Sequence, residues 1–480
     1  MSSQSQQMEQ LRSMIPPEEV FTPDHPQYKT QSQPWSNYAE LHPKMVIQPT
    51  ALTGLQKVVK YLYDSDLDFA IRNTGTGSVS AQDVILSMHG FKDFEFDKAA
   101  GTVVLGGGLD WGEADRLMDS KTPDYALVGA RCSWVGVAGS TLVGGLSWLS
   151  HEFGMISDPQ NLLDAQVVLG DGRVLWASEE PDLLWALRGG GGNFGVVTAL
   201  KMRARPYTQK IFSGIVTLPY SSLVETSRWV AAMAAKAVDP KLAMHVTNIG
   251  PGLGYPDSGS RPGIAIMMYD ANGEAHGRSD AGFGELYKLP GAQEVMAREF
   301  RLAELSAMAE PYRDYQGNNM FWLSAPLLEN IDDETLVRAW EWYEDSIDLH
   351  PGLGGGSTVL LEFMQENAFN LSGGRAATAW PHSGRRHVMQ LVLGCRPEGA
   401  PPDVREIVMK RFARAGPQIA LDKQSGEFHA GFLHEWNDLR QVYGENLDKL
   451  KLVKARYDPK NRFNKGVDLV GEKVTKGATV

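Results

Sequence analysis

Cysteine is scarce in this 480-residue chain, which contains only Cys132 and Cys395. Two cysteines cannot build the disulfide framework that stabilises small secreted domains. The chain has no uninterrupted apolar run of about eighteen residues, the length that a membrane-spanning helix needs. Its N-terminal segment is rich in Ser and Gln and lacks the apolar centre of a secretory signal. These absences predict a cytoplasmic protein that does not enter a membrane.

Positive charge is also in short supply. The chain has 46 Lys and Arg against 58 Asp and Glu, which gives a formal net charge of −12. A nucleic-acid binder needs a basic surface that displaces counterions from phosphates, so we exclude that class. The dipeptide His434-Glu435 has no second histidine at the spacing of a zinc helix, and the chain has no G-x-S-x-G sequence. We therefore expect neither a metal site nor a serine hydrolase.

The rest of the composition is typical of a globular protein with two domains. Apolar residues make up 42% of the chain and charged residues 22%, and its 480 residues exceed one core of about 250–300 residues. Strands are expected at residues 45–48, 68–72, 84–88, 102–105, 163–169, 173–177, 196–202, 212–218, 243–249, 264–269, 359–365 and 388–393. Helices are expected at residues 51–64, 111–118, 146–153, 183–187, 222–235, 295–309 and 333–347.

Residues 190–195 match the pattern G-x-G-x-x-G of nicotinamide-binding Rossmann folds. That fingerprint needs a strand before the glycines and a helix after them, so that the pyrophosphate meets a helix N-terminus. Here a short helix is expected before the glycines and a strand after them. This order excludes the Rossmann interpretation.

Residues 73–78 and 129–145 are better candidates for phosphate binding. Each stretch places small residues in a loop that follows a strand or precedes a helix, so consecutive backbone N–H groups can converge on an anion. Either loop alone is more often an ordinary tight turn. Two such loops in one domain favour a long ligand with two binding points, such as a dinucleotide.

Three stretches carry a family resemblance: I-R-N-T-G-T-G-S at residues 71–78, V-G-V-A-G-S-T-L-V-G-G at 135–145, and D-L-L-W-A-L-R-G-G-G-G-N-F-G-V-V-T at 182–198. Together with residues 443–446 and 456–464, they resemble the FAD-binding domain and C-terminal segment of berberine-bridge-enzyme-like oxidases. These oxidases belong to the wider vanillyl-alcohol-oxidase type. The resemblance covers residues 49–206 and 436–467.

The resemblance implies an α+β fold with two domains. A vanillyl-alcohol-oxidase-type FAD-binding domain, made of two α/β subdomains, would precede a substrate domain with a mainly antiparallel sheet covered by helices. The implied division is an N-terminal arm at residues 1–40, the FAD-binding domain at 41–206, the substrate domain at 207–425 and a C-terminal return to the FAD-binding domain at 426–480.

The resemblance also assigns residues to the cofactor. Residues 73–78 would wrap the FAD pyrophosphate with backbone donors, and the later glycine stretches would pass along the flavin. The implied cofactor-binding residues are Arg72, Asn73, Thr74, Gly75, Thr76, Gly77, Ser78, Cys132, Val135, Gly136, Ala138, Gly139, Ser140, Leu142, Gly145, Gly192, Gly195, Val196 and Asn446.

Two positions bear on how FAD would be attached. Many family members have a histidine bonded to the flavin where this chain has Thr76, so a histidyl link is excluded here. Cys132 stands at the second attachment position, where a 6-S-cysteinyl link and a small, unreactive buried thiol are the alternatives. Thr74 and Val143 replace glycines that are common in the family, and either side chain could crowd FAD.

The sequence leaves the catalytic base open. Plant members carry a glutamate after a Gly-Gly pair, and this chain has Arg375 there. Glu362 is a replacement if the strand at residues 359–365 turns that face to the flavin, since alternate residues share a face. A solvated strand carboxylate is the ordinary alternative. Tyr312 and His429 are further candidates, although a lone Tyr or His is more often a packing residue.

The resemblance implies an FAD-dependent oxidase, in which a hydride passes to the flavin and oxygen reoxidises it. The small side chain of Val135, expected on the oxygen-reactive side of the flavin, favours an oxidase. The tryptophans of the second domain, Trp322, Trp340, Trp342 and Trp380, suit a medium-sized, largely apolar substrate similar to a secondary metabolite. The alternatives are a non-redox cyclase or isomerase with the flavin lost or structural, and a small-molecule carrier.

Overall fold

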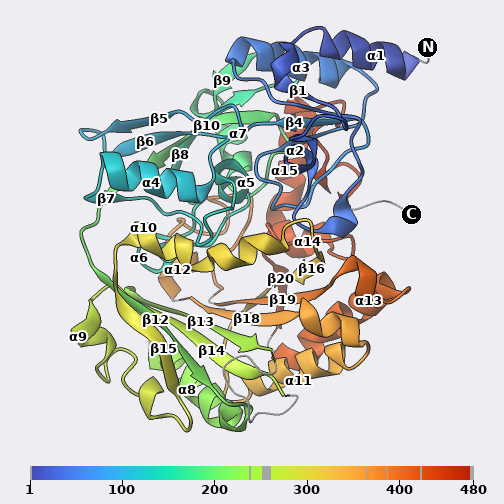
Figure 1. The fold of residues 1–480 in the computed structure, drawn as a ribbon. Coiled ribbons are helices and arrows are strands. Elements are labelled where there is room, and N and C mark those ends of the chain that lie inside the picture. Colours follow the sequence, from blue (N-terminus) through green and yellow to red (C-terminus); the bar gives the residue numbers. More distant parts are fainter. Residues whose placement is uncertain are drawn as a thin grey trace.

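The computed structural model describes residues 3–236, 239–250, 261–364, 366–385, 387–421 and 424–475. In Figure 1 the first domain lies above the large sheet of the second domain. The last helices of the chain, α14 (Leu439–Tyr443) and α15 (Leu447–Tyr457), return to the first domain, where α15 packs on α7 (Pro181–Leu187). None of the described helices is long and apolar enough to cross a membrane.

The first domain begins with a four-stranded sheet in the order β1-β2-β4-β3, formed by Val20–Phe21, Met45–Ile47, Val84–Ser87 and Phe69–Arg72. Strands β2, β4 and β3 run parallel to one another. Helix α3 (Leu52–Asp64) covers this sheet with the apolar stripe that its sequence spacing predicts. Helix α1 (Ser3–Arg12) adds Leu11 to the same core.

The second sheet of this domain has five antiparallel strands in the order β5-β6-β10-β8-β9, formed by Phe94–Asp97, Thr102–Gly106, Val196–Arg203, Leu162–Val168 and Val174–Trp176. The predicted hairpin joins β8 to β9. Its helices are α4 (Trp111–Lys121), α5 (Val137–Leu142), α6 (Ser150–Phe153) and α7, and β7 (Tyr125–Ala126) pairs with β11 (Arg205–Pro206). Helix α5 lies in a stretch that the sequence analysis assigned to a loop.

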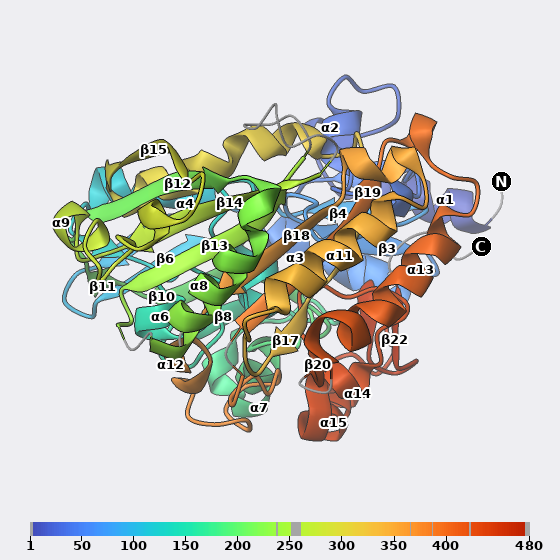
Figure 2. The same cartoon turned by 90° about the horizontal axis from the view of Figure 1, so that it is seen from below.

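The second domain has a nine-stranded antiparallel sheet, which confirms the mainly antiparallel sheet that the resemblance implied. Its order is β15-β12-β14-β13-β18-β19-β17-β20, formed by Gln293–Phe300, Ile211–Leu218, Gly263–Asp270, Leu242–Ile249, Thr358–Phe363, His387–Cys395, Pro326–Leu328 and Gln424–Phe428, with β16 (Met320–Ser324) beside β19. Helices α8 (Leu223–Lys236), α11 (Thr335–Ile347) and α13 (Val404–Ala415) cover one face, which Figure 2 shows from below. The other face looks toward the first domain.

The two faces of this sheet carry different side chains, because successive residues of each strand point to opposite faces. On β18, Val359, Leu361 and Phe363 enter the core beneath the helices. Because successive side chains of a strand point to opposite faces, Glu362 points toward the first domain. The short helices α2 (Tyr28–Ser32), α9 (Glu274–Gly277) and α12 (Glu366–Asn370) and the hairpin β21-β22 (Gly466–Asp468 and Lys473–Thr475) complete the fold.

The predicted helix at residues 295–309 is wrong. Residues Gln293–Phe300 form β15, which pairs with β12 at the edge of the sheet. Only short helical turns follow, α10 (Leu302–Leu305) and the 3₁₀ segment η7 (Ser306–Tyr315). Glu, Met, Ala and Arg favour a helix in isolation, but the ladder of hydrogen bonds to β12 outweighs that preference.

Three of the four tryptophans expected near the substrate lie elsewhere. Trp322, Trp340 and Trp342 are buried in the core between the sheet and its covering helices. The fourth, Trp380, packs against the first domain, where it fills the space beside Gly144 and Gly189. These tryptophans stabilise the two cores, and they give no support for a largely apolar substrate.

Candidate active site

Three glycine-containing loops of the first domain meet, at residues 73–78, 129–145 and 189–195. The side chain of Asn73 packs on Gly136, where an added Cβ would lie 2.7 Å from Nδ2. The carbonyl oxygen of Leu142 accepts hydrogen bonds from the N–H groups of Gly189 at 3.0 Å and Gly191 at 2.9 Å. The first and third loops are therefore each joined to the middle loop.

The loops leave both donors and space free. Among the described residues, none accepts a hydrogen bond from the N–H groups of residues 74–77. Gly75 has φ +85°, a left-handed conformation that turns successive N–H groups toward one side. An added Cβ on Gly77, Gly139 or Gly192 would meet nothing within 4 Å. Each loop thus presents a bare backbone to open space.

These features fit FAD. A run of free N–H groups suits a diphosphate, and small residues allow the backbone to approach it. The side chain of Val143 packs toward Gly431 and Gly191, and the hydroxyl of Thr74 lies 3.0 Å from the hydroxyl of Thr76. The two residues that replace family glycines are therefore both held by contacts within the protein.

Arg72 requires a correction. We predicted that it would bind the cofactor, but its guanidinium is buried under the N-terminal arm. It donates hydrogen bonds to the carbonyl oxygens of Thr30 at 3.2 Å, Gln33 at 3.1 Å and Thr74 at 3.1 Å. Burial lowers the pKa of Arg72 to about 10. The side chain of Arg72 supports the first loop from behind.

Several other predicted cofactor residues also have protein partners. Gly195 and Val196 enter β10, where Gly195 packs against the backbone of Val168. Asn446 donates to the carbonyl oxygens of Arg375 at 2.8 Å and Thr378 at 2.9 Å. The hydroxyls of Ser78 and Ser140 also accept hydrogen bonds within the protein, and Gly145 packs closely against Ile156. The other predicted residues, Asn73, Thr74, Gly75, Thr76, Gly77, Val135, Gly136, Ala138, Gly139, Leu142 and Gly192, belong to the three joined loops.

The N-terminal arm clamps the first loop. The ring of Trp35 stacks on Trp134 of the middle loop, with centroids 5.4 Å apart and an interplanar angle of 9°. The N–H group of Trp35 donates to the carbonyl oxygen of Gly75 at 2.9 Å. The N–H group of Ser36 donates to the hydroxyl of Ser78 at 3.0 Å. The arm therefore ties the first loop to the middle loop.

Trp35→Ala is expected to weaken FAD binding by about two- to tenfold, because an aromatic stack contributes about 0.5–1.5 kcal/mol to holding the loop. Titration of the apoprotein with FAD, followed by flavin fluorescence, measures the dissociation constant. The control is Trp176→Ala, a partly exposed tryptophan on β9 outside the three cofactor loops. An equal loss of affinity in both variants would count against the clamp.

Cys132 lies in the middle loop. Burial raises the pKa of its thiol to about 11, against the opposing charge of Arg131, and the carboxylates of Glu362 and Glu310 add to the rise. The hydroxyl of Thr76 donates to the carbonyl oxygen of Trp134 at 3.4 Å. The residues at the two flavin-attachment positions therefore belong to one joined pair of loops.

A buried polar cluster connects the middle loop to the sheet of the second domain. Arg131 donates from one amino group to Glu362 on β18 and from the other to Nε2 of His245 on β13. Gln390 on β19 donates to the same oxygen of Glu362, Oε1. Glu362 is fully buried, and its second oxygen, Oε2, has no hydrogen-bond partner among the described residues.

Glu362 has the properties of a general base. Burial raises its pKa, and the charge of Arg131 and the hydrogen bonds from Arg131 and Gln390 oppose that rise. A buried carboxylate with a raised pKa and an uncommitted oxygen can take a proton from a substrate. The predicted orientation of this face toward the cofactor domain agrees with the Arg131 contact.

The other two candidate bases differ in their surroundings. Tyr312 on η7 is 59% exposed and stacks on Tyr315. His429 is buried, lies 3.0 Å by Nε2 from the carbonyl oxygen of Gly144, and accepts at Nδ1 from the N–H group of Gly431 at 3.0 Å. Burial lowers the pKa of His429 to about 3. With both nitrogens engaged, His429 links two segments and has no nitrogen free for a substrate.

Sequence reasoning missed Arg131, His245 and Gln390. They come from distant segments. The pairing of β13, β18 and β19 brings His245 and Gln390 to Glu362, with His245 directly opposite it, and Arg131 reaches them from the middle loop. One signal was present in the sequence. Gln390 is a polar residue in the middle of an apolar strand, where a buried side chain needs a partner.

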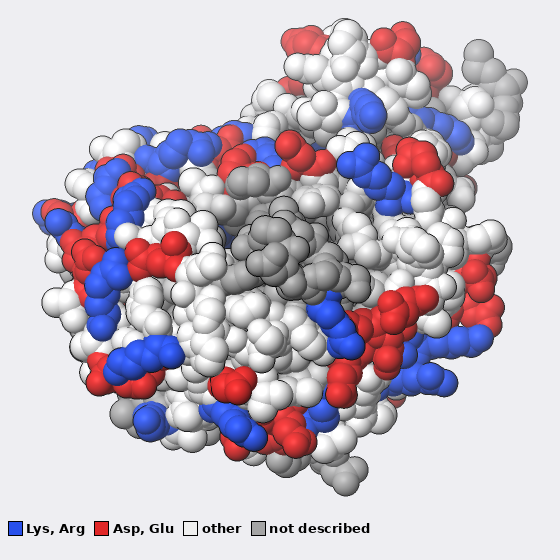
Figure 3. Space-filling model, turned by 60° about the horizontal axis from the view of Figure 1, so that its bottom comes forward, with Lys and Arg blue, Asp and Glu red and all other residues white. Residues whose placement is uncertain are grey.

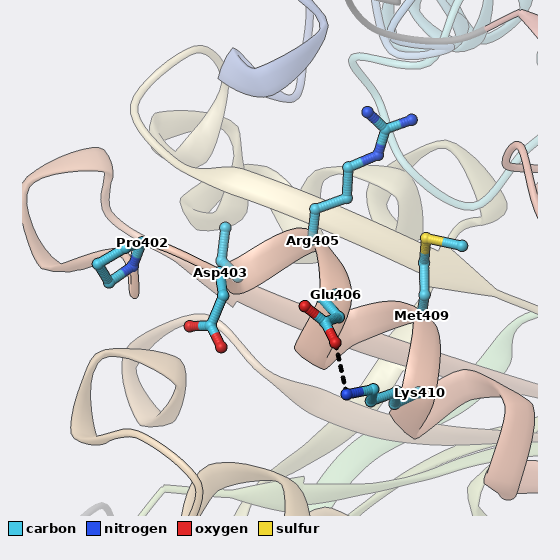
Figure 4. Close-up of a pocket in the computed structure, with 7 residues that line it drawn as sticks. Pro402, Asp403, Arg405, Glu406, Met409 and Lys410 are labelled. Atoms are coloured by element: carbon cyan, nitrogen blue, oxygen red, sulfur yellow. Dashed lines mark hydrogen bonds and ion pairs between the residues drawn. The ribbon is translucent and has the colours of Figure 1, made fainter. Parts of the chain in front are cut away.

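A surface hollow at the start of α13 is not part of this site. Figure 4 shows that its lining comes from one short stretch: Pro402, Asp403, Val404, Arg405, Glu406, Met409 and Lys410. Acidic and basic side chains are interspersed on the face in Figure 3. Within the described ranges, no group of three His, Cys, Asp or Glu residues could hold a metal ion.

The loops and the buried carboxylate facing them define an FAD-dependent oxidoreductase. Residues 43–178 match the family described as "FAD binding domain", and residues 427–466 match "Berberine and berberine like". In these two stretches the chain is similar to the berberine-bridge-enzyme-like FAD-linked oxidoreductases. Its two α+β domains agree with the fold that the resemblance implied.

Individual relatives agree with this family. The chain is 22% identical to the FAD-linked oxidoreductase iacH of Pestalotiopsis fici, over 94% of this chain and 88% of the relative. It is 28% identical to the (R)-6-hydroxynicotine oxidase of Paenarthrobacter nicotinovorans, over 42% of this chain and 44% of that one. The solved structure of BBE-like 1 of Physcomitrella patens has a TM-score of 0.77 at 18% identity, covering 95% of this chain and 97% of that one.

Proposed function

We propose that this enzyme oxidises a medium-sized, largely apolar organic substrate and passes the electrons to oxygen. When bound, FAD supplies the hydride acceptor. The proposal rests on Glu362, a buried carboxylate that reaches the cofactor loops through Arg131 and keeps one oxygen unpartnered. The site would act on a carbon that bears a hydrogen and an adjacent O–H or N–H group.

In this proposal Glu362 accepts the proton, and Arg131 and Gln390 orient its carboxylate. Oε2 of Glu362 accepts the proton of the substrate O–H or N–H group while a hydride leaves the neighbouring carbon, which becomes a C=O or C=N group. Arg131 and Gln390 hold the other oxygen, Oε1, and so orient the carboxylate. Oxygen receives the two electrons and two protons, which makes hydrogen peroxide the second product.

The surroundings of Glu362 support an apolar substrate. By the strand alternation, Leu360 and Met267 share the face of Glu362, and both are partly buried. Apolar side chains around a few placed polar groups are typical of pockets for small organic molecules. We expect a small-molecule substrate and oxygen as partners, without nucleic acid or a membrane, and we expect a cytoplasmic location from the low cysteine content.

Oxygen consumption tests the proposal. Purified holoenzyme is incubated with a panel of apolar secondary alcohols and cyclic amines, with an oxygen electrode and a peroxide assay as readouts. We expect equal amounts of oxygen consumed and peroxide formed with at least one class, and anaerobic bleaching of the flavin by the same compound. Conversion of a compound without oxygen uptake or bleaching would favour the non-redox cyclase or isomerase.

FAD is expected to be bound without a covalent link. The pKa of about 11 for the thiol of Cys132 leaves little thiolate at neutral pH, and the thiolate is the nucleophile that would form a 6-S-cysteinyl bond. Acid precipitation should release the yellow colour into the supernatant for both the wild type and Cys132→Ser. Yellow colour that stays in the pellet of the wild type but passes into the supernatant of Cys132→Ser would establish the cysteinyl link.

A further inference from the structure

His245 has only one hydrogen-bonding role open to it at Nε2. Its neighbour there is an amino group of Arg131, and a guanidinium has donors but no acceptors. Nε2 of His245 must therefore accept, and the ring is neutral. Burial and the charges of Arg131 and His151 lower the pKa of His245 well below its ordinary value, which agrees with a neutral ring.

The ring of His245 is held in place from the first domain. Trp148 stacks on it with centroids 4.1 Å apart at 25°, and also lies parallel to Tyr269 at 5.5 Å. The hydroxyl of Tyr269 lies 2.9 Å from the hydroxyl of Tyr207, which donates to Glu152 at 2.9 Å. Packing from both domains therefore fixes where Nε2 can lie.

In this arrangement the two amino groups of Arg131 bind different partners. An arginine beside a carboxylate commonly pairs with both oxygens through two parallel hydrogen bonds. Here one amino group goes to Oε1 of Glu362 and the other is taken by His245. Oε2 of Glu362 is left without a partner among the described residues, although the side chain is fully buried.

We propose that His245 is a positioning residue: by accepting one amino group of Arg131, it prevents Arg131 from closing on both oxygens of Glu362. The oxygen that would receive the substrate proton stays free for that reason. The catalytic part of this inference rests on the proposed function, in which Glu362 is the base. The hydrogen-bonding geometry that it predicts can be measured without a substrate.

The ionisation of Glu362 in the holoenzyme provides the test. The infrared C=O band of the protonated acid is followed against pH and assigned by its loss in Glu362→Gln. His245→Phe keeps an aromatic ring beside Trp148 but has no acceptor. Arg131 should then bind both carboxylate oxygens and move the midpoint down by about one pH unit, a tenfold change in the ionisation constant.

Two further variants test the direction of the shift in the Glu362 midpoint and control for the loss of the imidazole ring. His245→Gln restores an acceptor near Nε2 and should return the midpoint toward the wild-type value. Gln390→Leu removes a donor from Oε1 and should move the midpoint in the opposite direction, upward. Other titrating groups near the cluster are His151, Cys132 and Glu310. They are unchanged in all of these variants.

The outcomes separate this inference from the proposed function. An unchanged or raised midpoint in His245→Phe would overturn the positioning role, whatever the activity of the variant. A lowered midpoint with full recovery in His245→Gln supports it. If His245→Phe does not fold, His245→Leu is measured in the same way, with the thermal melting curve as the check on folding. Full activity of Glu362→Gln would instead overturn the proposed function and leave the hydrogen-bond geometry standing.

Discussion

Glu362→Gln is expected to lower the anaerobic rate of flavin reduction by about 10²- to 10⁴-fold, the usual contribution of a positioned general base. Glutamine keeps the shape of the side chain and can still accept from Arg131, but it cannot take a proton. Binding of substrate should change little, because the apolar contacts remain. Stopped-flow mixing of the holoenzyme with the substrate found by oxygen uptake measures both the rate and its dependence on substrate concentration.

The pH dependence of this rate gives a second check. Burial raises the pKa of Glu362, and the carboxylate acts as a base only when it is ionised. The rate should therefore be full above this raised pKa and fall as the pH drops through it. Glu362→Gln should lose this acid limb and retain a low rate throughout.

A matched control comes from an exposed glutamate of the same domain. Glu406 on α13 pairs only with Lys410 in the next helical turn, so Glu406→Gln should keep both the rate and the acid limb. An acid limb that persists in Glu362→Gln would assign the titration to another group. A rate within a factor of two of the wild type would remove Glu362 as the base.

Lys454→Met is expected to lower the free energy of unfolding by about 3–5 kcal/mol, the cost of removing one partner from a buried ion pair. Lys454 and Asp458 are both fully buried, and Nζ of Lys454 donates to Oδ2 of Asp458 at 2.5 Å. Nζ also donates to the carbonyl oxygens of Asn193 at 2.8 Å and Phe463 at 2.9 Å. The variant leaves the carboxylate and both carbonyls without this donor.

The same lysine holds the third cofactor loop, since Asn193 belongs to residues 189–195. Lys454→Met should therefore also weaken FAD binding, which fluorescence titration measures alongside thermal and urea unfolding. Lys454→Met combined with Asp458→Leu removes both charges and should recover much of the stability. Lys410→Met on the surface should leave the melting temperature unchanged. An unaltered melting temperature in Lys454→Met would mean that the pair contributes nothing.

The local elements of the first domain could be predicted from the sequence. The helix now called α3 and the hairpin β8-β9 follow from apolar spacing and from an Asp-Gly turn, which are properties of neighbouring residues. The glycine loops were found because an anion needs bare backbone wherever the loop lies. By contrast, the helix prediction at residues 295–309 was wrong because part of this segment pairs with β12, a strand more than seventy residues away along the chain.

The chemistry of the site depended far more on tertiary structure. The sequence by itself indicated a dinucleotide-like ligand, because small residues in two loops offer bare backbone to phosphate, and the family resemblance of those loops implied FAD. It named Glu362 as a candidate base but could not show which face of its strand was buried or what lay there. The partners Arg131, His245 and Gln390 were decided only when β13, β18 and β19 paired and the first domain packed on their shared face. Periodicity along one strand tells which residues share a face, whereas the packing of separate segments determines what that face meets.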